Sequence, residues 1–216
     1  MQAPAATAVS GINGKTWGNI SPNFGVYHPE KADPEKSKAY FEAALNNAGL
    51  ASVDDIPEFD LLTREDPQDP KLVTVYFLSV LNGLGLKVNL IQSTGNQFWT
   101  TLYKPSLGYD FAVAGWGPDF DDPITYMGYW NSGSMDMGVT YENTDFDALL
   151  LAANKETDPM KRAEVLAKAE AMFSDGAPSI PLLHWKGSTA INPKVKGIVF
   201  QSFGAPINYY TADIVE

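Results

Sequence analysis

The chain has 216 residues, 44% of them hydrophobic and 19% charged, so it can bury a sizeable core as one or two domains. Its formal net charge is -11, and so acidic a chain would repel a phosphate backbone, which excludes nucleic acid as a partner. The lack of cysteine excludes disulfides and thiolate metal sites and leaves the compartment open.

The sequence changes character near residue 30. Residues 1–30 are rich in Gly, Asn, Ser and Pro and predict an irregular N-terminal segment. Residues 33–49 predict the first helix, because Asp33 is a good N-cap, Pro34 is a good first helical residue and apolar residues recur at helical spacing. We therefore separate the irregular segment from a folded part, residues 31–216.

Helices and strands alternate along the middle of the chain. Residues 58–64, 86–92 and 109–116 predict three strands. The helix predicted at 69–85 is apolar over most of its surface, as is typical of a helix buried between layers. A short helix is expected at 96–104. This order indicates an α/β layered domain.

Two further helices are predicted at 143–156 and 158–173, followed by strands at 179–191 and 195–200. The expected capping residues are Asn143 or Thr144 for the first helix and Asp158 for the second. The fold class predicted is α/β, with a mixed sheet flanked by helices in a single unit over residues 31–216.

An unusual loop follows the strand predicted at 109–116. Two glycines flank a tryptophan and three aspartates come next: Gly115, Trp116, Gly117, Asp119, Asp121 and Asp122. Ligands of open α/β sheets bind beyond the carboxyl ends of the strands, where this loop falls. Glycines leave the backbone bare, so that another chain can approach it closely. A carboxylate beside bare backbone suits a ligand that carries an amine and amide groups.

Several ordered motifs resemble one known family. They are YDFAVAGWGPDFDDPITYM, NSGSMDMGVTYENTDFDALLLAA, AEVLAKAEAMF, SIPLLHW, DPEKSKAYFEAAL and LNGLGLKVNLIQ. Together they are similar to the C-terminal lobe of the oligopeptide-binding proteins that serve ABC importers. The resemblance implies one ligand-binding lobe of a two-lobed receptor of the periplasmic-binding-protein type (type II). Its partners would be an oligopeptide, the missing N-terminal lobe and a membrane ABC permease.

The resemblance also implies site residues. The carboxylate that meets the amine of the ligand falls on Asp119, and the tryptophan of the family falls on Trp116. Backbone contacts to an extended peptide, made by strand addition, fall on Gly115 and Gly117. Some relatives carry a basic residue at the position of Val113 to meet a peptide carboxylate, and its absence here argues against a fixed ligand length. The resemblance implies no cofactor, metal or catalytic residue.

Each of these side chains has a structural alternative. Asp122 precedes a proline, as Asp33 does, and is expected to cap a helix. Asp121 could be a solvated loop charge, Asp119 a local turn contact and Trp116 a core residue. Two other tryptophans are expected to pack in the core, since large aromatic residues dominate cores: Trp99 and Trp130. Two methionines could form an adaptable pocket wall or fill a loop: Met135 and Met137.

Other functions stay open. Three clustered carboxylates could serve a glycoside hydrolase, but its acid and base normally come from different elements at a defined separation. The string PDFDDP lacks the register and the closing glutamate of an EF-hand, and His28 and His184 have no metal-ligand spacing. The same fold could also bind a dipeptide, a metal chelate or an oligosaccharide. We favour oligopeptide capture without catalysis, because the carboxylate lies beside exposed backbone.

A receptor for an importer is expected outside the cell membrane, either as an anchored extracellular lipoprotein or free in the periplasm. The longest apolar run, residues 72–81, is about half of the roughly 20 residues that span a bilayer. Residues 1–10 lack the basic start and apolar core of a signal peptide. If the protein is exported, we therefore expect its anchor and signal to lie outside this chain.

Overall fold

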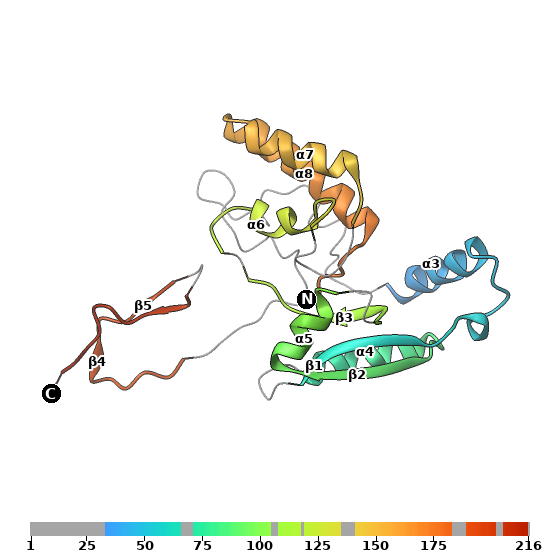
Figure 1. Cartoon of the computed structure of the whole chain (residues 1–216), viewed down its shortest axis with the longest axis horizontal. Helices are drawn as coiled ribbons and strands as arrows, with labels where there is room; N and C mark the ends of the chain where they lie inside the picture. The colour runs from blue at the N-terminus through green and yellow to red at the C-terminus, as the bar shows by residue number, and fades with distance from the viewer. Residues whose placement is uncertain are drawn as a thin grey trace. The chain divides into compact units, whose positions relative to one another are not determined.

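The computed structural model describes residues 33–65, 71–104, 108–117, 119–134, 141–182, 189–201 and 205–215. Contacts divide the chain into two compact units. The strand unit contains the described residues from 33 to 115 together with 133 and 134, and the helix unit contains the remainder. The border falls between Gly115 and Trp116. Each unit is described below by itself (Figure 1).

The strand unit is built on a parallel sheet of three strands in the order β2-β1-β3. These strands are β1 (Phe59–Glu65), β2 (Val88–Thr94) and β3 (Phe111–Val113). In the central strand Leu61, Leu62 and Thr63 are all buried, so both faces of β1 are covered. A continuous buried run is typical of a parallel strand between two layers of helices.

Two helices cover opposite faces of β1. Thr63 Oγ1 lies 3.1 Å from Thr74 Oγ1 of α4 (Lys71–Gly83), whereas Leu62 packs with Phe98 of α5 (Gly95–Leu102). Successive side chains of a strand point to opposite faces, so these two contacts place α4 and α5 on different sides of the sheet. Each helix forms part of the crossover between two parallel strands, as the sequence order predicts.

The described part of the strand unit begins with α3 (Pro34–Asn47), followed by the 3-10 turn η2 (Val53–Asp55). The side chain of Asp33 accepts a hydrogen bond from the backbone N of Lys36 at 3.0 Å. This bond satisfies one of the free N–H groups at the start of a helix, so the predicted N-cap is confirmed.

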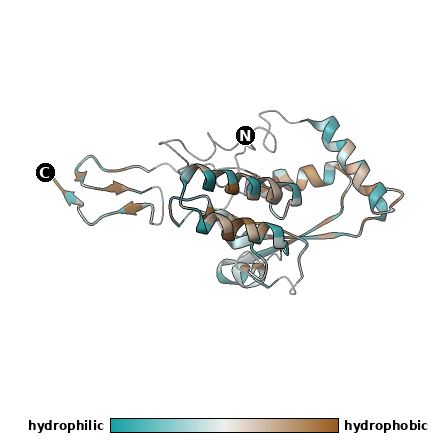
Figure 2. Ribbon diagram, turned by 90° about the horizontal axis from the view of Figure 1, so that it is seen from above, coloured by the Kyte–Doolittle hydropathy of each residue, from teal (hydrophilic) through white to brown (hydrophobic). Residues whose placement is uncertain are grey.

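The helix unit is centred on α7 (Thr144–Lys155) and α8 (Pro159–Gly176), which lie side by side in Figures 1 and 2. Figure 2 shows hydrophobic and hydrophilic residues along both helices. Phe146 and Leu166 are buried, and the rings of Phe146 and Phe173 lie 5.9 Å apart. Both caps are confirmed, because the side chain of Asn143 accepts from two backbone N–H groups of α7 and that of Asp158 from two of α8.

Short elements complete the helix unit. The loop after Gly117 leads into α6 (Ile124–Met127) and the 3-10 turn η4 (Gly128–Trp130). Near the C-terminus two antiparallel pairs form, β4 with β7 and β5 with β6. Their bounds are Val195–Lys196 for β4, Val199–Phe200 for β5, Ile207–Asn208 for β6 and Asp213–Ile214 for β7.

The α/β class with flanking helices is confirmed, and three of the predicted elements need correction. The strand predicted at 195–200 is broken at Gly197, which has φ +73, and a Cβ there would overlap the carbonyl oxygen of Thr211. The described ends of the segment 179–191 contain no strand; in the first of them, Pro181 lacks the N–H that a ladder requires. The strand predicted at 109–116 is only three residues long, because the backbone leaves the sheet after Val113.

The surface of α4 also differs from the prediction. Its buried residues, Thr74 and Leu81, face the sheet, but Val75, Tyr76 and Val80 are exposed by 60%, 68% and 42%. The described chain therefore covers only one side of this apolar helix. No helix among the described residues is both long and apolar enough to cross a bilayer.

Candidate functional site

The predicted ligand loop begins at the border of the two units. Gly115 is the last residue of the strand unit before the border, and Trp116 is the first residue of the helix unit. Gly115 and Gly117 are both exposed. A Cβ added to Gly117 would meet nothing within 4 Å, so packing within the described chain does not require glycine there. The backbone at Gly117 is therefore open to an approaching molecule.

Asp119 is exposed and held at two points. Its backbone N donates to Thr125 Oγ1 at 3.2 Å, and its Oδ2 accepts from the hydroxyl of Tyr129 at 2.8 Å. Thr125 is itself buried, with 2% of its surface exposed. The second carboxylate oxygen, Oδ1, has no hydrogen-bond partner among the described residues. A carboxylate has about four lone-pair sites, so Asp119 can accept further hydrogen bonds from a ligand.

Trp116 connects to the same tyrosine. The rings of Trp116 and Tyr129 lie 4.3 Å apart in an edge-to-face arrangement with an interplanar angle of 64°. Trp116 is half-buried, and its indole Nε1 is buried without a hydrogen-bond partner in the described part of the chain. Trp116, Tyr129 and Asp119 therefore form one connected group, which we call the tyrosine cluster.

The loop is fastened to α8 by an ion pair. Both carboxylate oxygens of Asp122 accept from the guanidinium of Arg162, at 2.7 and 3.0 Å, and the two side chains are only about a quarter exposed. Asp122 Oδ1 also accepts from the backbone N of Ile124 at the start of α6. This bond is of the predicted capping kind, although the N-cap position of α6 itself is Pro123, and the ion pair of Asp122 with Arg162 was not predicted. Bidentate pairs of this kind are among the stronger polar contacts in proteins.

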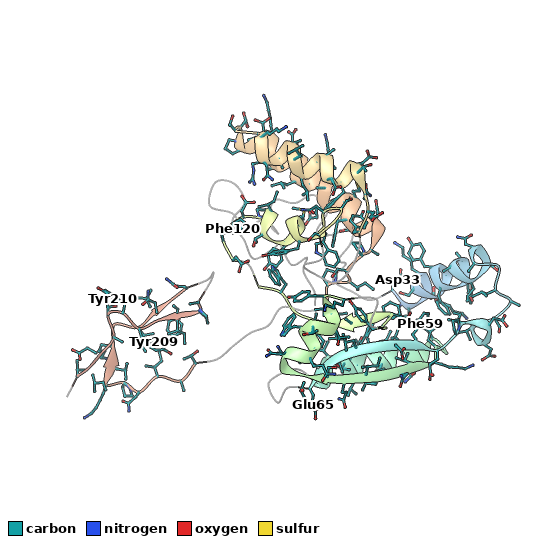
Figure 3. All side chains as sticks on the ribbon, viewed as in Figure 1. Asp33, Phe59, Glu65, Phe120, Tyr209 and Tyr210 are labelled. Atoms are coloured by element: carbon teal, nitrogen blue, oxygen red, sulfur yellow. The ribbon has the colours of Figure 1, made fainter. Side chains whose placement is uncertain are left out.

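The aromatic residues next to the loop are packed as expected. Trp130 is buried with its ring 5.1 Å from that of Phe173 in α8, and Trp99 lies against the core of the strand unit. Tyr126 is half-buried in α6, and this burial raises the pKa of its hydroxyl above the usual value of 10.0. Phe120, beside Asp119, is 51% exposed (Figure 3).

Sequence reasoning placed Trp116 and Asp119 in one site, and the structure brings them together through Tyr129. It missed three contacting residues: Thr125, Tyr129 and Arg162. Thr125 and Tyr129 follow the loop directly, so the short helical stretch that places them could have pointed to them. Arg162 lies 40 residues from Asp122 along the chain, and nothing in the local sequence links the two.

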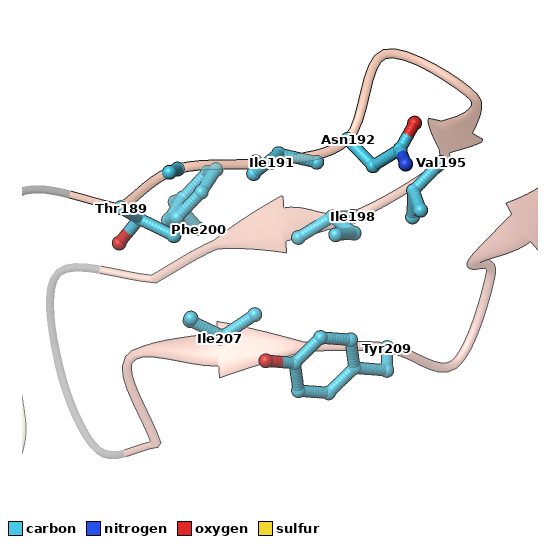
Figure 4. A pocket seen from close by; sticks show the side chains of 9 residues that line it. Thr189, Ile191, Asn192, Val195, Ile198, Phe200, Ile207 and Tyr209 are labelled. Carbon is cyan, nitrogen blue, oxygen red and sulfur yellow. The ribbon is translucent and has the colours of Figure 1, made fainter.

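Other candidate sites are less suitable. No group of three or more His, Cys, Asp or Glu side chains within the described ranges could hold a metal ion. His28, His184, Met135 and Met137 lie outside the described residues. A hollow of about 260 Å³ lies among the C-terminal strands (Figure 4), lined by Thr189, Ala190, Ile191, Asn192, Val195, Ile198, Phe200, Ile207 and Tyr209. None of these lining residues carries a carboxylate, so the hollow offers no side-chain countercharge to an ammonium group.

Comparison with known proteins gives three sequence and structure matches of note. The chain is 31% identical over 175 residues to oligopeptide-binding protein OppA of Bacillus subtilis (strain 168), covering 80% of this chain and 31% of that protein. It is 25% identical over 174 residues to dipeptide-binding protein DppE of the same organism, covering 81% of this chain and 31% of that protein. The chain thus spans about a third of the length of the curated relatives it matches.

The fold matches the substrate-binding domain of an oligopeptide ABC transporter from Bacillus anthracis str. Ames. The TM-score is 0.80 at 24% identity, and the match covers 97% of this chain and 39% of that chain. This likeness confirms the type II periplasmic-binding-protein fold. A sequence model of the bacterial extracellular solute-binding proteins, family 5, matches residues 2–137 through its middle region. Since that match extends over more than half of the chain, the protein belongs to the family 5 bacterial extracellular solute-binding proteins.

Proposed function

We propose that the chain is the ligand-binding lobe of a solute-binding protein that captures oligopeptides for an ABC importer. The observation that carries the proposal is the exposed carboxylate of Asp119, which is held by its neighbours and has one oxygen without a partner among the described residues. The α-amino group of a free peptide has a pKa near 8 and is mostly protonated at neutral pH, so a site that encloses it needs a countercharge. Asp119 provides that countercharge.

The backbone beside Asp119 would bind the following residues of the peptide. Gly115 and Gly117 are exposed, and a Cβ added to Gly117 would meet no described atom within 4 Å. Main-chain hydrogen bonds to an extended peptide give affinity without reading its side chains. Trp116, which is half-buried and lies between the two glycines in the sequence, would contact the peptide there. This arrangement suits peptides of varied sequence better than a sugar, which offers no ammonium group.

A second lobe belongs to the proposal. Relatives more than twice as long carry the names of peptide-binding proteins, and two-lobed receptors close over their ligand by a hinge. The exposed residues of α4 would pack against such a lobe: Val75, Tyr76 and Val80. Exposed apolar patches on a soluble protein commonly mark an interface. The receptor would then work outside the cell membrane, anchored as a lipoprotein or free in the periplasm, and would deliver peptide to a membrane permease.

The function as a receptor, and not as an enzyme, can be tested directly. The complete receptor that carries this chain is titrated with unmodified peptides in a calorimeter, and the peptides are then analysed by liquid chromatography. We expect saturable binding and full recovery of intact peptide. Cleaved peptide, or release of the chromophore from an aryl glycoside, would contradict a receptor without catalysis.

A further inference from the structure

The carboxylate of Asp119 is oriented by a tyrosine that no motif assigns to the site. The hydroxyl of Tyr129 donates to Asp119 Oδ2 at 2.8 Å, while Thr125 Oγ1 accepts from the backbone N of Asp119. Both partners lie in the short helical stretch of α6 and η4 that follows the loop. An exposed aspartate would otherwise rotate freely about its side-chain bonds. Here its backbone and its side chain are both held.

Tyr129 is itself held in place. Its ring is half-buried and contacts the ring of Trp116 edge to face at 4.3 Å. The stretch that carries it contacts α8 through Trp130 with Phe173, and the loop just before the stretch is joined to α8 through Asp122 with Arg162. A continuous series of contacts therefore runs from the core of the helix unit to the carboxylate. Rigid support of this kind keeps a binding group in its productive geometry.

The hydrogen bond from Tyr129 leaves room for a ligand. It uses Oδ2 of Asp119, and Oδ1 has no partner among the described residues. An ammonium group could therefore donate to Oδ1 while Tyr129 keeps its bond to Oδ2. The tyrosine and the ligand do not compete for the same oxygen.

We infer that Tyr129 is a positioning residue, which fixes the direction of the Asp119 carboxylate before the ligand arrives. The inference rests on the proposed role of Asp119 as the anchor of the peptide amine. Ordering a mobile side chain during binding lowers affinity, and a side chain that is already ordered avoids this loss. Trp116 supports the tyrosine ring, which gives the tryptophan a structural part in the same arrangement.

The test is Tyr129→Phe in the complete receptor, because phenylalanine keeps the ring and its contact with Trp116 and removes only the hydroxyl. Affinity is measured by calorimetry for a free peptide and for its N-acetylated form. We expect the free peptide to bind about fivefold more weakly, as loss of one pre-ordered side chain implies. The acetylated peptide has no ammonium group, so its affinity should not change.

Tyr126→Phe is the matched control. Tyr126 is half-buried in α6, just before the 3-10 turn that carries Tyr129, and its hydroxyl makes no hydrogen bond within the described part of the chain. Its removal should leave the affinities of both peptides unchanged. A purely structural role of Tyr129 would instead lower the affinity for both peptides by the same factor, which would overturn the inference.

The double variant separates this inference from the proposed function. If Tyr129 acts through the side chain of Asp119, then Tyr129→Phe should have no further effect on free-peptide affinity once Asp119→Ala is present, because alanine leaves the hydroxyl no polar group to position. If Asp119→Asn lowers the affinity for the free peptide and Tyr129→Phe does not, Asp119 is the amine anchor and the positioning role of Tyr129 is wrong. If Asp119→Asn changes the affinity for neither peptide, Asp119 is not the amine anchor, and the positioning role of Tyr129 is overturned as well.

Discussion

The substitution Asp119→Asn removes the charge proposed to meet the peptide amine and changes little else. Two unit charges about 4 Å apart interact by about 4 kcal/mol at an effective dielectric constant near 20. The amide keeps one oxygen, and the hydroxyl of Tyr129 can accept as well as donate, so the variant can still offer a neutral hydrogen bond of about 1 kcal/mol to the ligand. The difference, about 3 kcal/mol, corresponds to roughly a hundredfold loss of affinity.

The assay is calorimetric titration of the complete receptor with one peptide in its free and N-acetylated forms. The free peptide should lose about a hundredfold in affinity for the variant. The acetylated peptide should bind wild type more weakly than the free peptide does and should be nearly indifferent to the substitution. If both peptides bind the variant as tightly as they bind wild type, Asp119 is not the amine anchor and its contacts serve only the structure of the loop.

Two further predictions concern stability. Asp122→Asn should lower the free energy of unfolding by about 2 kcal/mol, because it breaks a bidentate, largely buried pair with Arg162. Glu42→Gln, which removes an exposed pair with Lys38, should change the free energy of unfolding by less than about 0.5 kcal/mol. Equal urea midpoints for the two variants would contradict this. Ala177→Gly should raise the melting temperature by about 2 °C, because Ala177 ends α8 at φ 47, and Ala48→Gly, at φ -77, should lower it. A lower melting temperature for Ala177→Gly would refute that assignment of strain.

Local chemistry explains which parts of the fold were predictable. Asp33 and Asp158 could be predicted as N-caps, and Asn143 as one of two candidates, because capping depends on residues two or three positions away. The alternation of helices and strands could be predicted as well, because the spacing of apolar residues is also a local property of each segment. The break at Gly197 was not, because it depends on the carbonyl of Thr211, which comes close only after the strands have paired.

The site divides in the same way. Trp116 and Asp119 could be found from a continuous motif, whereas the contacts that orient them could not. The ion pair of Asp122 with Arg162 joins residues 40 apart, and the bond from Tyr129 to Asp119 depends on how α6 and η4 turn back toward the loop. Such contacts follow from packing between elements, and a pattern within one element does not contain them.

Native mass spectrometry of the complete receptor, purified without added ligand, tests the central claim most directly. A receptor for oligopeptides should retain them from the host, so we expect bound masses that dissociate on activation and fragment as peptides. Replacement of Asp119 by asparagine should leave most of the receptor molecules without bound peptide. A bound sugar, tetrapyrrole or metal chelate in place of peptide would contradict the proposed function.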